Sequence, residues 1–297
     1  MFKNALIYRI APTWTANLEM IEAGLEAARY VECGASQEKS VGWTEPRGEA
    51  HGPLVESVGG QLMLKLMIEV KAVPGSVINR KAKEQLAQIE AGTGRKPGKR
   101  ETKEIKEDIK LALMPMAFTK LGAVVVWIDA AAQLLVIDAA SQAKADEVIT
   151  YLVKCLDGFS LLPINPQTSC SVAMSEWLSS QEPPAGFTID RECELKSPDE
   201  TKAVVRYSRH ALDIDEVRQH ITSGKVPTKL AMTWDGRVSF LLTDTLQIKK
   251  IAFLDGVFEV SSQEKEDGFD ADTAIATGEL RNLIPDLLSA LGGEMAT

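Results

Sequence analysis

Between two runs of strand-forming residues the chain carries a long polar insertion, and the helical periodicity of this insertion limits how it can fold. The first run is QLMLKLMIEV at 61–70 and the second is AVVVWID at 123–129. Within the insertion, one apolar residue recurs per helical turn, first at Ile78, Ala82, Leu86 and Ile89 and then at Ile105, Ile109, Leu113 and Met116. Helix breakers separate the two stripes at Gly92, Gly94, Pro97 and Gly98. Stripes this narrow, with no aromatic residue before Phe118, predict a helical hairpin that projects from the body and packs mostly against itself.

The joint of this predicted hairpin collects positive charge in an acidic chain. The formal charge of the chain is −9, but residues 71–110 carry 11 Lys and Arg against 6 Asp and Glu, which leaves −14 for the rest. The basic residues at the joint are Arg95, Lys96, Lys99, Arg100 and Lys103. Cations on a mobile loop suit phosphate contact that does not depend on base sequence. Lys- and Glu-rich helices are also common as solvated faces with pairs four residues apart, so charge alone leaves both interpretations open.

Other motifs give little support for a bound nucleotide or metal. The joint is not a Walker-type phosphate loop, because its glycine spacing is wrong and Arg100 stands where a hydroxyl would reach Mg²⁺. The three histidines, His51, His210 and His220, have no partner at metal-ligand spacing. We therefore expect no cofactor and no metal.

A Mg²⁺-dependent nuclease is the sharpest enzymatic alternative. Glu69 and Lys71 form an acidic-x-Lys pair at a strand end, and Asp129 and Asp138 end neighbouring strands. Such carboxylates can bind Mg²⁺ and such a lysine can position water. Charged groups are also common at strand ends without any catalytic role, and short patterns of this kind arise by chance. We expect a protein that is not an enzyme.

The order of the remaining elements predicts an α+β fold with antiparallel or mixed sheets and helices packed on one face. Strands are expected at 2–10, 133–140, 202–212 and 248–254, with a hairpin that turns at Asp235-Gly236. Helices are expected at 13–30, 141–156, 172–180, 213–224 and 277–293. We predict a central α+β domain of residues 1–73 and 119–166, a hairpin tip of residues 74–118, and a base α+β domain of residues 167–297.

The compartment is expected to be the cytoplasm. No apolar run is long enough to cross a bilayer, and the N-terminus lacks the features of a signal peptide. The four cysteines, Cys33, Cys155, Cys170 and Cys193, are widely spaced without a CxxC pair, which is typical of reduced thiols.

Motifs spread over nearly the whole chain resemble the RdgC family of bacterial recombination-associated proteins. They are MFKNALIYR, GWTEPRG, GRKPGKRE, LMPMAF, WIDAAAQLLVIDAAS, SEWL, GFTIDRECELKSP, HITSGKVPTKLAMTWDGRVSFLL and LGGE. None of them is a catalytic signature, but their order and spacing together are specific to the family.

The resemblance implies a crescent subunit that forms a ring-shaped homodimer around double-stranded DNA. In the family, binding is largely independent of sequence and limits access of the RecA recombinase to DNA, which implies nucleoid association and antagonism of RecA. Single-stranded DNA is a further ligand to consider. A protein-interaction scaffold without DNA affinity is the remaining alternative.

The resemblance also assigns residues. Phe118 corresponds to the aromatic residue of the gate at the tip, and Arg95, Lys96 and Lys99 align with basic residues there, whereas Gly98 and Arg100 differ in detail. Arg209 and His210 correspond to a Lys-Gln pair at the second dimer contact. Arg209 keeps the positive charge of the family's lysine, and we also expect it to contact DNA. His210 differs from the family, since an imidazole stands where the family has an amide.

Overall fold

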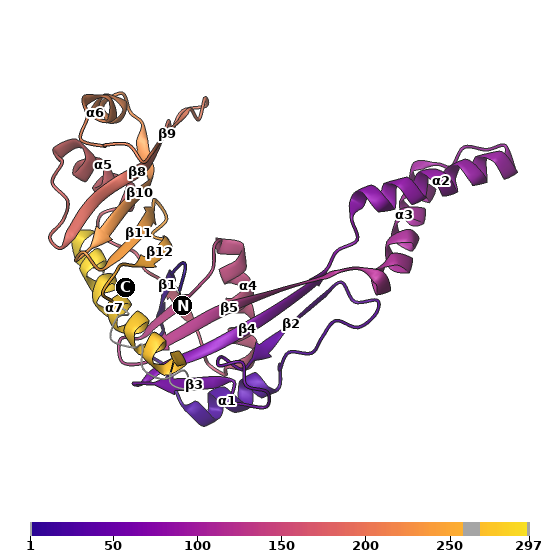
Figure 1. Cartoon of the computed structure of the whole chain (residues 1–297), viewed down its shortest axis with the longest axis horizontal. Coiled ribbons are helices and arrows are strands. Elements are labelled where there is room, and N and C mark those ends of the chain that lie inside the picture. Colours follow the sequence, from indigo (N-terminus) through magenta and orange to yellow (C-terminus); the bar gives the residue numbers. More distant parts are fainter. Residues whose placement is uncertain (1, 258–267, 296–297) are drawn as a thin grey trace.

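The computed structural model describes residues 2–257 and 268–295. Their helices and strands form two groups, each with one β-sheet (Figure 1). The first group is β1 (Leu6–Ile10), α1 (Leu18–Glu26), β2 (Lys39–Thr44), β3 (Val55–Val58), β4 (Gln61–Lys71), α2 (Gly75–Thr93), α3 (Lys99–Leu113), the 3₁₀ turn η1 (Met114–Met116), β5 (Thr119–Asp129), β6 (Leu134–Ile137), α4 (Gln142–Cys155) and β7 (Leu161–Pro163). The second group is α5 (Cys170–Ser180), β8 (Phe187–Lys196), β9 (Val204–Ser208), α6 (Asp215–Thr222), β10 (Val226–Trp234), β11 (Val238–Thr243), β12 (Ile248–Phe253) and α7 (Gly268–Ala290). In the described residues the named strands pair only in antiparallel fashion and seven α-helices are present, so the predicted α+β class is confirmed.

The first sheet carries the hairpin at one end. Its strand order is β2–β4–β5–β6–β1–β7, and β3 also pairs with β4. The longest pair, β4 with β5, runs in register from Gln61 opposite Asp129 to Lys71 opposite Thr119. Because the hairpin is inserted between these two strands, its two connections leave the sheet side by side (Figure 1).

Helices α1 and α4 cover one face of the first sheet. Ile21 and Leu25 of α1 and Leu152 of α4 are buried in one hydrophobic cluster with strand residues such as Leu64. Gly24 lies so close to the end of α4 that a Cβ atom there would stand 2.2 Å from the carbonyl oxygen of Cys155. Only glycine therefore permits this approach of the two helices.

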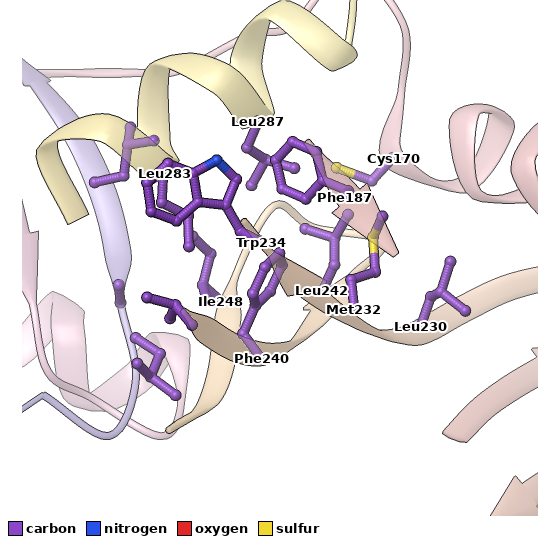
Figure 2. Packing of buried hydrophobic residues seen from close by; sticks show 14 of the residues in the cluster. Cys170, Phe187, Leu230, Met232, Trp234, Phe240, Leu242, Ile248, Leu283 and Leu287 are labelled. Carbon is purple, nitrogen blue, oxygen red and sulfur yellow. The ribbon is translucent and has the colours of Figure 1, made fainter. Parts of the chain in front are cut away.

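The second sheet has the order β12–β11–β10–β8–β9 and buries one face against α5 and α7. Figure 2 shows Leu283 and Leu287 of α7 pointing toward Trp234 and Phe187 of the sheet. The indole Nε1 of Trp234 also donates a hydrogen bond to Asp286 of α7, at 2.9 Å. The prediction of helices on one face is therefore confirmed for this sheet.

Contacts across the junction connect the two sheets. One hydrophobic cluster contains Met63 and Trp127 of the first sheet together with Ile284 of α7. The backbone N–H of Ala5 donates to the carbonyl of Ile248 at 2.7 Å, and an isolated antiparallel bridge joins these two residues. Apolar burial and backbone hydrogen bonds together stabilise the position of the second sheet on the first.

The hairpin packs against itself as its periodicity predicts. Ala82, Ile105 and Ile109 are buried between α2 and α3, and the partly buried residues around them are Ile78, Leu86, Ile89 and Leu113. The prediction was wrong for Met116, which is 72% exposed. Met114 is buried instead, because Pro115 lies in the tighter turn η1 and the chain there leaves the helical stripe. Figure 1 shows α2 and α3 extending away from both sheets.

Among residues 2–257 and 268–295, no helix combines the length and the apolar character that crossing a bilayer requires.

Candidate nucleic-acid interface

The basic joint lies at the far end of the hairpin. Helix α2 ends at Thr93, and Gly94 follows in the left-handed conformation with φ of +68°, which glycine adopts without strain. Its N–H donates to the carbonyl of Glu90 at 2.9 Å, and Gly98 then precedes the first turn of α3. The sequence therefore forces a tight reversal here and turns the intervening side chains outward.

The cations of the joint differ in how they are paired. Arg95 forms an ion pair with Glu101 and Arg100 forms one with Glu104, each at 3.0 Å. Within the described part of the chain, the joint cations without an ion pair are Lys96, Lys99 and Lys103, all exposed. Surface pairs of this kind contribute about 0–1 kcal/mol, so phosphate can compete for the arginines as well. The joint thus presents lysines that are free to bind and arginines that are weakly held.

Phe118 stands at the opposite end of the arm from these cations. It lies two residues after η1, directly precedes β5 and is 93% exposed. Other exposed apolar residues of this region are Leu111, Met116 and Leu121. Helix α3 begins at Lys99 in the joint and runs for 15 residues, about 22 Å, toward Phe118. The arm therefore carries an apolar surface at its base and a cationic surface at its end.

An ion pair fastens the base of the arm to the body. Lys110 in the last turns of α3 contacts Glu38, just before β2, at 2.7 Å. The hydrogen bond to Glu38 raises the pKa of Lys110. This contact lies on the same part of the arm as Phe118, far from the joint.

Arg209 and His210 lie on the second sheet, immediately after the edge strand β9. Both are exposed, and Arg209 has a φ of +55°, which is uncommon for a residue with a side chain. The Nδ1 atom of His210 lies 2.7 Å from the carbonyl oxygen of Ala211, and its ring is 5.7 Å from that of Tyr207. The structure does not bring these two residues near the basic joint; they lie at the other end of the molecule (Figure 1).

Glu69 and Lys71 are engaged in local hydrogen bonds. The side chain of Glu69 is buried and accepts from the hydroxyl of Tyr30 and the N–H of Cys33, both at 2.6 Å. The hydrogen bond from Tyr30, with that from Cys33, lowers the pKa of Glu69. Lys71 donates to the carbonyls of Cys33 and Gly34, at 3.2 and 2.9 Å. These contacts hold the loop at 33–34 against the end of β4.

The two aspartates of the nuclease alternative are not beside Glu69. Asp129 pairs with Gln61, eight residues from Glu69 along β4, which is about 26 Å. Buried Asp129 forms an ion pair with Arg281 of α7 at 2.7 Å, whereas Asp138 accepts from the N–H of Asn4 at 2.8 Å. Within the described ranges no group of three or more His, Cys, Asp or Glu side chains is arranged to hold a metal ion.

Comparison with known proteins identifies the family. A family model described as "Putative exonuclease, RdgC" matches residues 1–294. The chain belongs to the RdgC family. Three similar relatives, all called recombination-associated protein RdgC, cover nearly its whole length. Those of Dechloromonas aromatica (strain RCB) and Herminiimonas arsenicoxydans are 44% and 42% identical over 99% of this chain, and over 98% and 99% of their own lengths. That of Bordetella pertussis is 42% identical over 99% of this chain and 98% of its own length. The resemblance to the RdgC family is thereby confirmed.

This RdgC family member carries a second group of cations that its charge pattern along the sequence does not predict. They lie on the second sheet, on the face turned away from α5 and α7, and include Arg206, Lys229 and Lys250. The sequence does indicate a charged strand face here, because charged residues alternate with apolar ones in RECELK at 191–196. A count of charge along the chain does not reveal the cations, because Glu192 and Glu194 offset the charge of the nearby lysines and arginines.

Proposed function

We propose that this chain binds double-stranded DNA without sequence preference, as a ring-shaped homodimer of crescent subunits, and restrains RecA-dependent recombination. Its relatives are named recombination-associated proteins, which supports a role in recombination. The observation that carries DNA binding is the cationic joint, raised on a hairpin in a chain of net charge −9. An acidic body repels DNA, so the joint offers a favourable path for the phosphate backbone.

The absence of sequence preference follows from the kind of side chains at the joint. Lys96, Lys99 and Lys103 are exposed, Lys96 in the loop and Lys99 and Lys103 in the first turns of α3. A lysine is a point charge on a flexible stem, without the planar fork of donors that reads base edges. Contacts to phosphates position a protein on DNA but carry no sequence information. The proposed ligand is therefore the duplex backbone, with single-stranded DNA as a weaker ligand of the same surface.

Two contacts would close the ring in this proposal. An exposed Phe118 beside other apolar residues suits a two-fold contact between hairpins, since the same surface meets itself across the axis. A buried aromatic anchor commonly supplies a large part of the binding energy of such a contact. Arg209 and His210 would lie at the second contact, on the opposite side of the subunit. Encirclement would slow dissociation without any base contact and would obstruct a recombinase on the same DNA.

The proposed activity involves no catalysis, although the family description contains the word exonuclease. Glu69 accepts hydrogen bonds from Tyr30 and Cys33, and Asp129 forms an ion pair with Arg281. The test is incubation of end-labelled duplex with Mg²⁺: we expect intact DNA. Mg²⁺-dependent cleavage that is lost in Glu69→Ala would replace this part of the proposal with a nuclease.

A gel-shift assay tests the proposal as a whole. Wild-type protein is titrated onto two unrelated duplexes of equal length, each at several salt concentrations, and onto linear and closed circular DNA. We expect equal affinity for both sequences and a logarithm of affinity that falls linearly with the logarithm of salt concentration. Affinity that does not change with salt contradicts phosphate contact. No binding at low salt would leave the interaction scaffold as the better explanation.

A further inference from the structure

The solvent-facing side of the second sheet carries a row of charged side chains across neighbouring strands. On β8, β9 and β10 the residues that alternate with the buried ones point away from α5 and α7. In the register, Glu194 of β8 lies opposite Arg206 of β9 on one side and opposite Lys229 of β10 on the other. The three side chains therefore share one face and form a continuous row.

A carboxylate lies beneath two cations in this row. Glu194 Oε2 accepts from Arg206 Nε at 2.6 Å and from Lys229 Nζ at 3.1 Å, while Oε1 accepts from Thr228 Oγ1 at 2.8 Å. The side chain of Glu194 is 13% exposed, whereas that of Arg206 is 71% exposed. Burial alone would raise the pKa of Glu194, but the hydrogen bonds from Arg206, Thr228 and Lys229 outweigh burial and lower it to about 2. The carboxylate is therefore charged at neutral pH, and Arg206 is far more exposed to the solvent than Glu194 is.

Among the described strand residues, the same face carries more cations than carboxylates. Lys250 of β12 pairs with Glu192 of β8 at 2.6 Å, and Asp190 accepts from the hydroxyl of Thr233 at 2.8 Å. The basic residues of the face are Lys196, Arg206, Lys229, Lys249 and Lys250, and its acidic residues are Asp190, Glu192 and Glu194. This excess of positive charge stands out in a chain whose net charge is −9. Ion pairs that served only to hold the strands together would need no more cations than carboxylates.

We infer that this face is a second contact surface for the phosphodiester backbone, in which Arg206, Lys229 and Lys250 contact phosphates and Glu194 is a built-in counterion that limits their affinity. The inference rests on the proposed DNA binding. Arg206 uses Nε for Glu194, and a guanidinium has further N–H donors for a phosphate. Because Glu194 lies beneath the cations, it need not move when phosphate arrives. It fixes the direction of both cations and reduces the attraction of the surface for DNA.

Substitution of the carboxylate separates this role from a purely structural one. Glu194→Gln keeps the size and hydrogen-bonding capacity of the side chain but removes its charge. Glu26→Gln is the matched control, since Glu26 at the end of α1 is also a carboxylate paired with an arginine, Arg29. The dissociation constant of a short duplex is measured by fluorescence anisotropy as a function of salt for each full-length variant, after circular dichroism confirms folding.

We expect Glu194→Gln to bind several-fold more tightly than wild type and Glu26→Gln to bind like wild type. Lys229→Gln should bind more weakly, and its slope of log affinity against log salt should be smaller by about 0.9 for each phosphate that the variant no longer neutralises. If Glu194→Gln and Glu26→Gln shift the affinity equally, overall charge explains the effect and the inference is wrong. A second result would also overturn the inference. In that case Glu194→Gln and Lys229→Gln lower the melting temperature but leave duplex affinity unchanged, whereas substitution of the joint lysines weakens binding. If wild type does not bind at all, the proposed function fails first.

Discussion

The clearest test of the joint compares its free lysines with its paired arginines. The double variant Lys96→Ala/Lys99→Ala removes two cations that have no ion pair among the described residues, whereas Arg95→Ala/Arg100→Ala removes two that contact Glu101 and Glu104. If both lysines of each subunit contact phosphate, the variant dimer neutralises four fewer phosphates, and the slope of log affinity against log salt falls by about 3.6. Between 50 and 200 mM salt this difference amounts to roughly 150-fold in relative affinity.

The assay is a salt titration of duplex binding by fluorescence anisotropy, with Lys144→Ala/Lys154→Ala on α4 as the control for net charge. We expect the arginine variant to show a smaller fall in slope than the lysine variant, because Glu101 and Glu104 already compensate part of the arginine charge. A slope for Lys96→Ala/Lys99→Ala equal to that of the α4 control would refute the assignment of phosphate contacts to the joint. The arm would then serve another purpose, such as dimer contact alone.

Three further changes have defined outcomes. Phe118→Ser removes the exposed aromatic anchor of one of the two proposed contacts, so it should raise the monomer–dimer dissociation constant measured by sedimentation and lower duplex affinity; an unchanged dissociation constant contradicts its role at the contact. Arg281→Ala leaves buried Asp129 without its cation and should lower the free energy of unfolding by about 3 kcal/mol in denaturant titrations, whereas a decrease below about 1 kcal/mol would mean that the pair is solvated. Glu194 has a folded pKa of about 2, so its contribution to stability is full above its unfolded pKa of about 4.3 and disappears as pH falls through 2. The stability difference between wild type and Glu194→Gln should therefore shrink between about pH 4 and pH 2, and a difference that is constant over that range contradicts the assignment.

Local sequence pattern predicted most elements, since helices such as α3 bury one face and strands such as β4 and β6 are runs of apolar residues buried on both faces. The one-per-turn stripes at Ile105 and Ile109 predicted the self-packed hairpin, and the run of strand-forming residues QLMLKLMIEV at 61–70 predicted β4. Met116 was assigned to the stripe wrongly, since a 3₁₀ turn at Pro115 changes the phase of the helix in a way that spacing alone does not reveal.

Long-range pairing could not be predicted in the same way. The row of Arg206, Glu194 and Lys229 depends on the register of three strands that are separated along the chain by α6 and a long loop. Register follows from which faces the sheet buries, and this is settled only when both sheets and α7 pack together. The ion pair between Asp129 and Arg281 is another product of that packing, because its partners are 152 positions apart in the sequence.

The separation of Phe118 from the basic joint determines what a contact between two hairpins would do. If two copies met at Phe118, about 22 Å of α3 would carry each joint beyond the contact and toward the partner subunit. The cations of one subunit would then lie beside DNA held mainly by the other. Closure and phosphate contact would thus be separate properties of one arm. Phe118→Ser should therefore change the relative affinity for linear and closed circular DNA, whereas Lys96→Ala/Lys99→Ala should weaken binding to both forms alike. Identical effects of the two variants on both forms would show that the arm acts as a single unit.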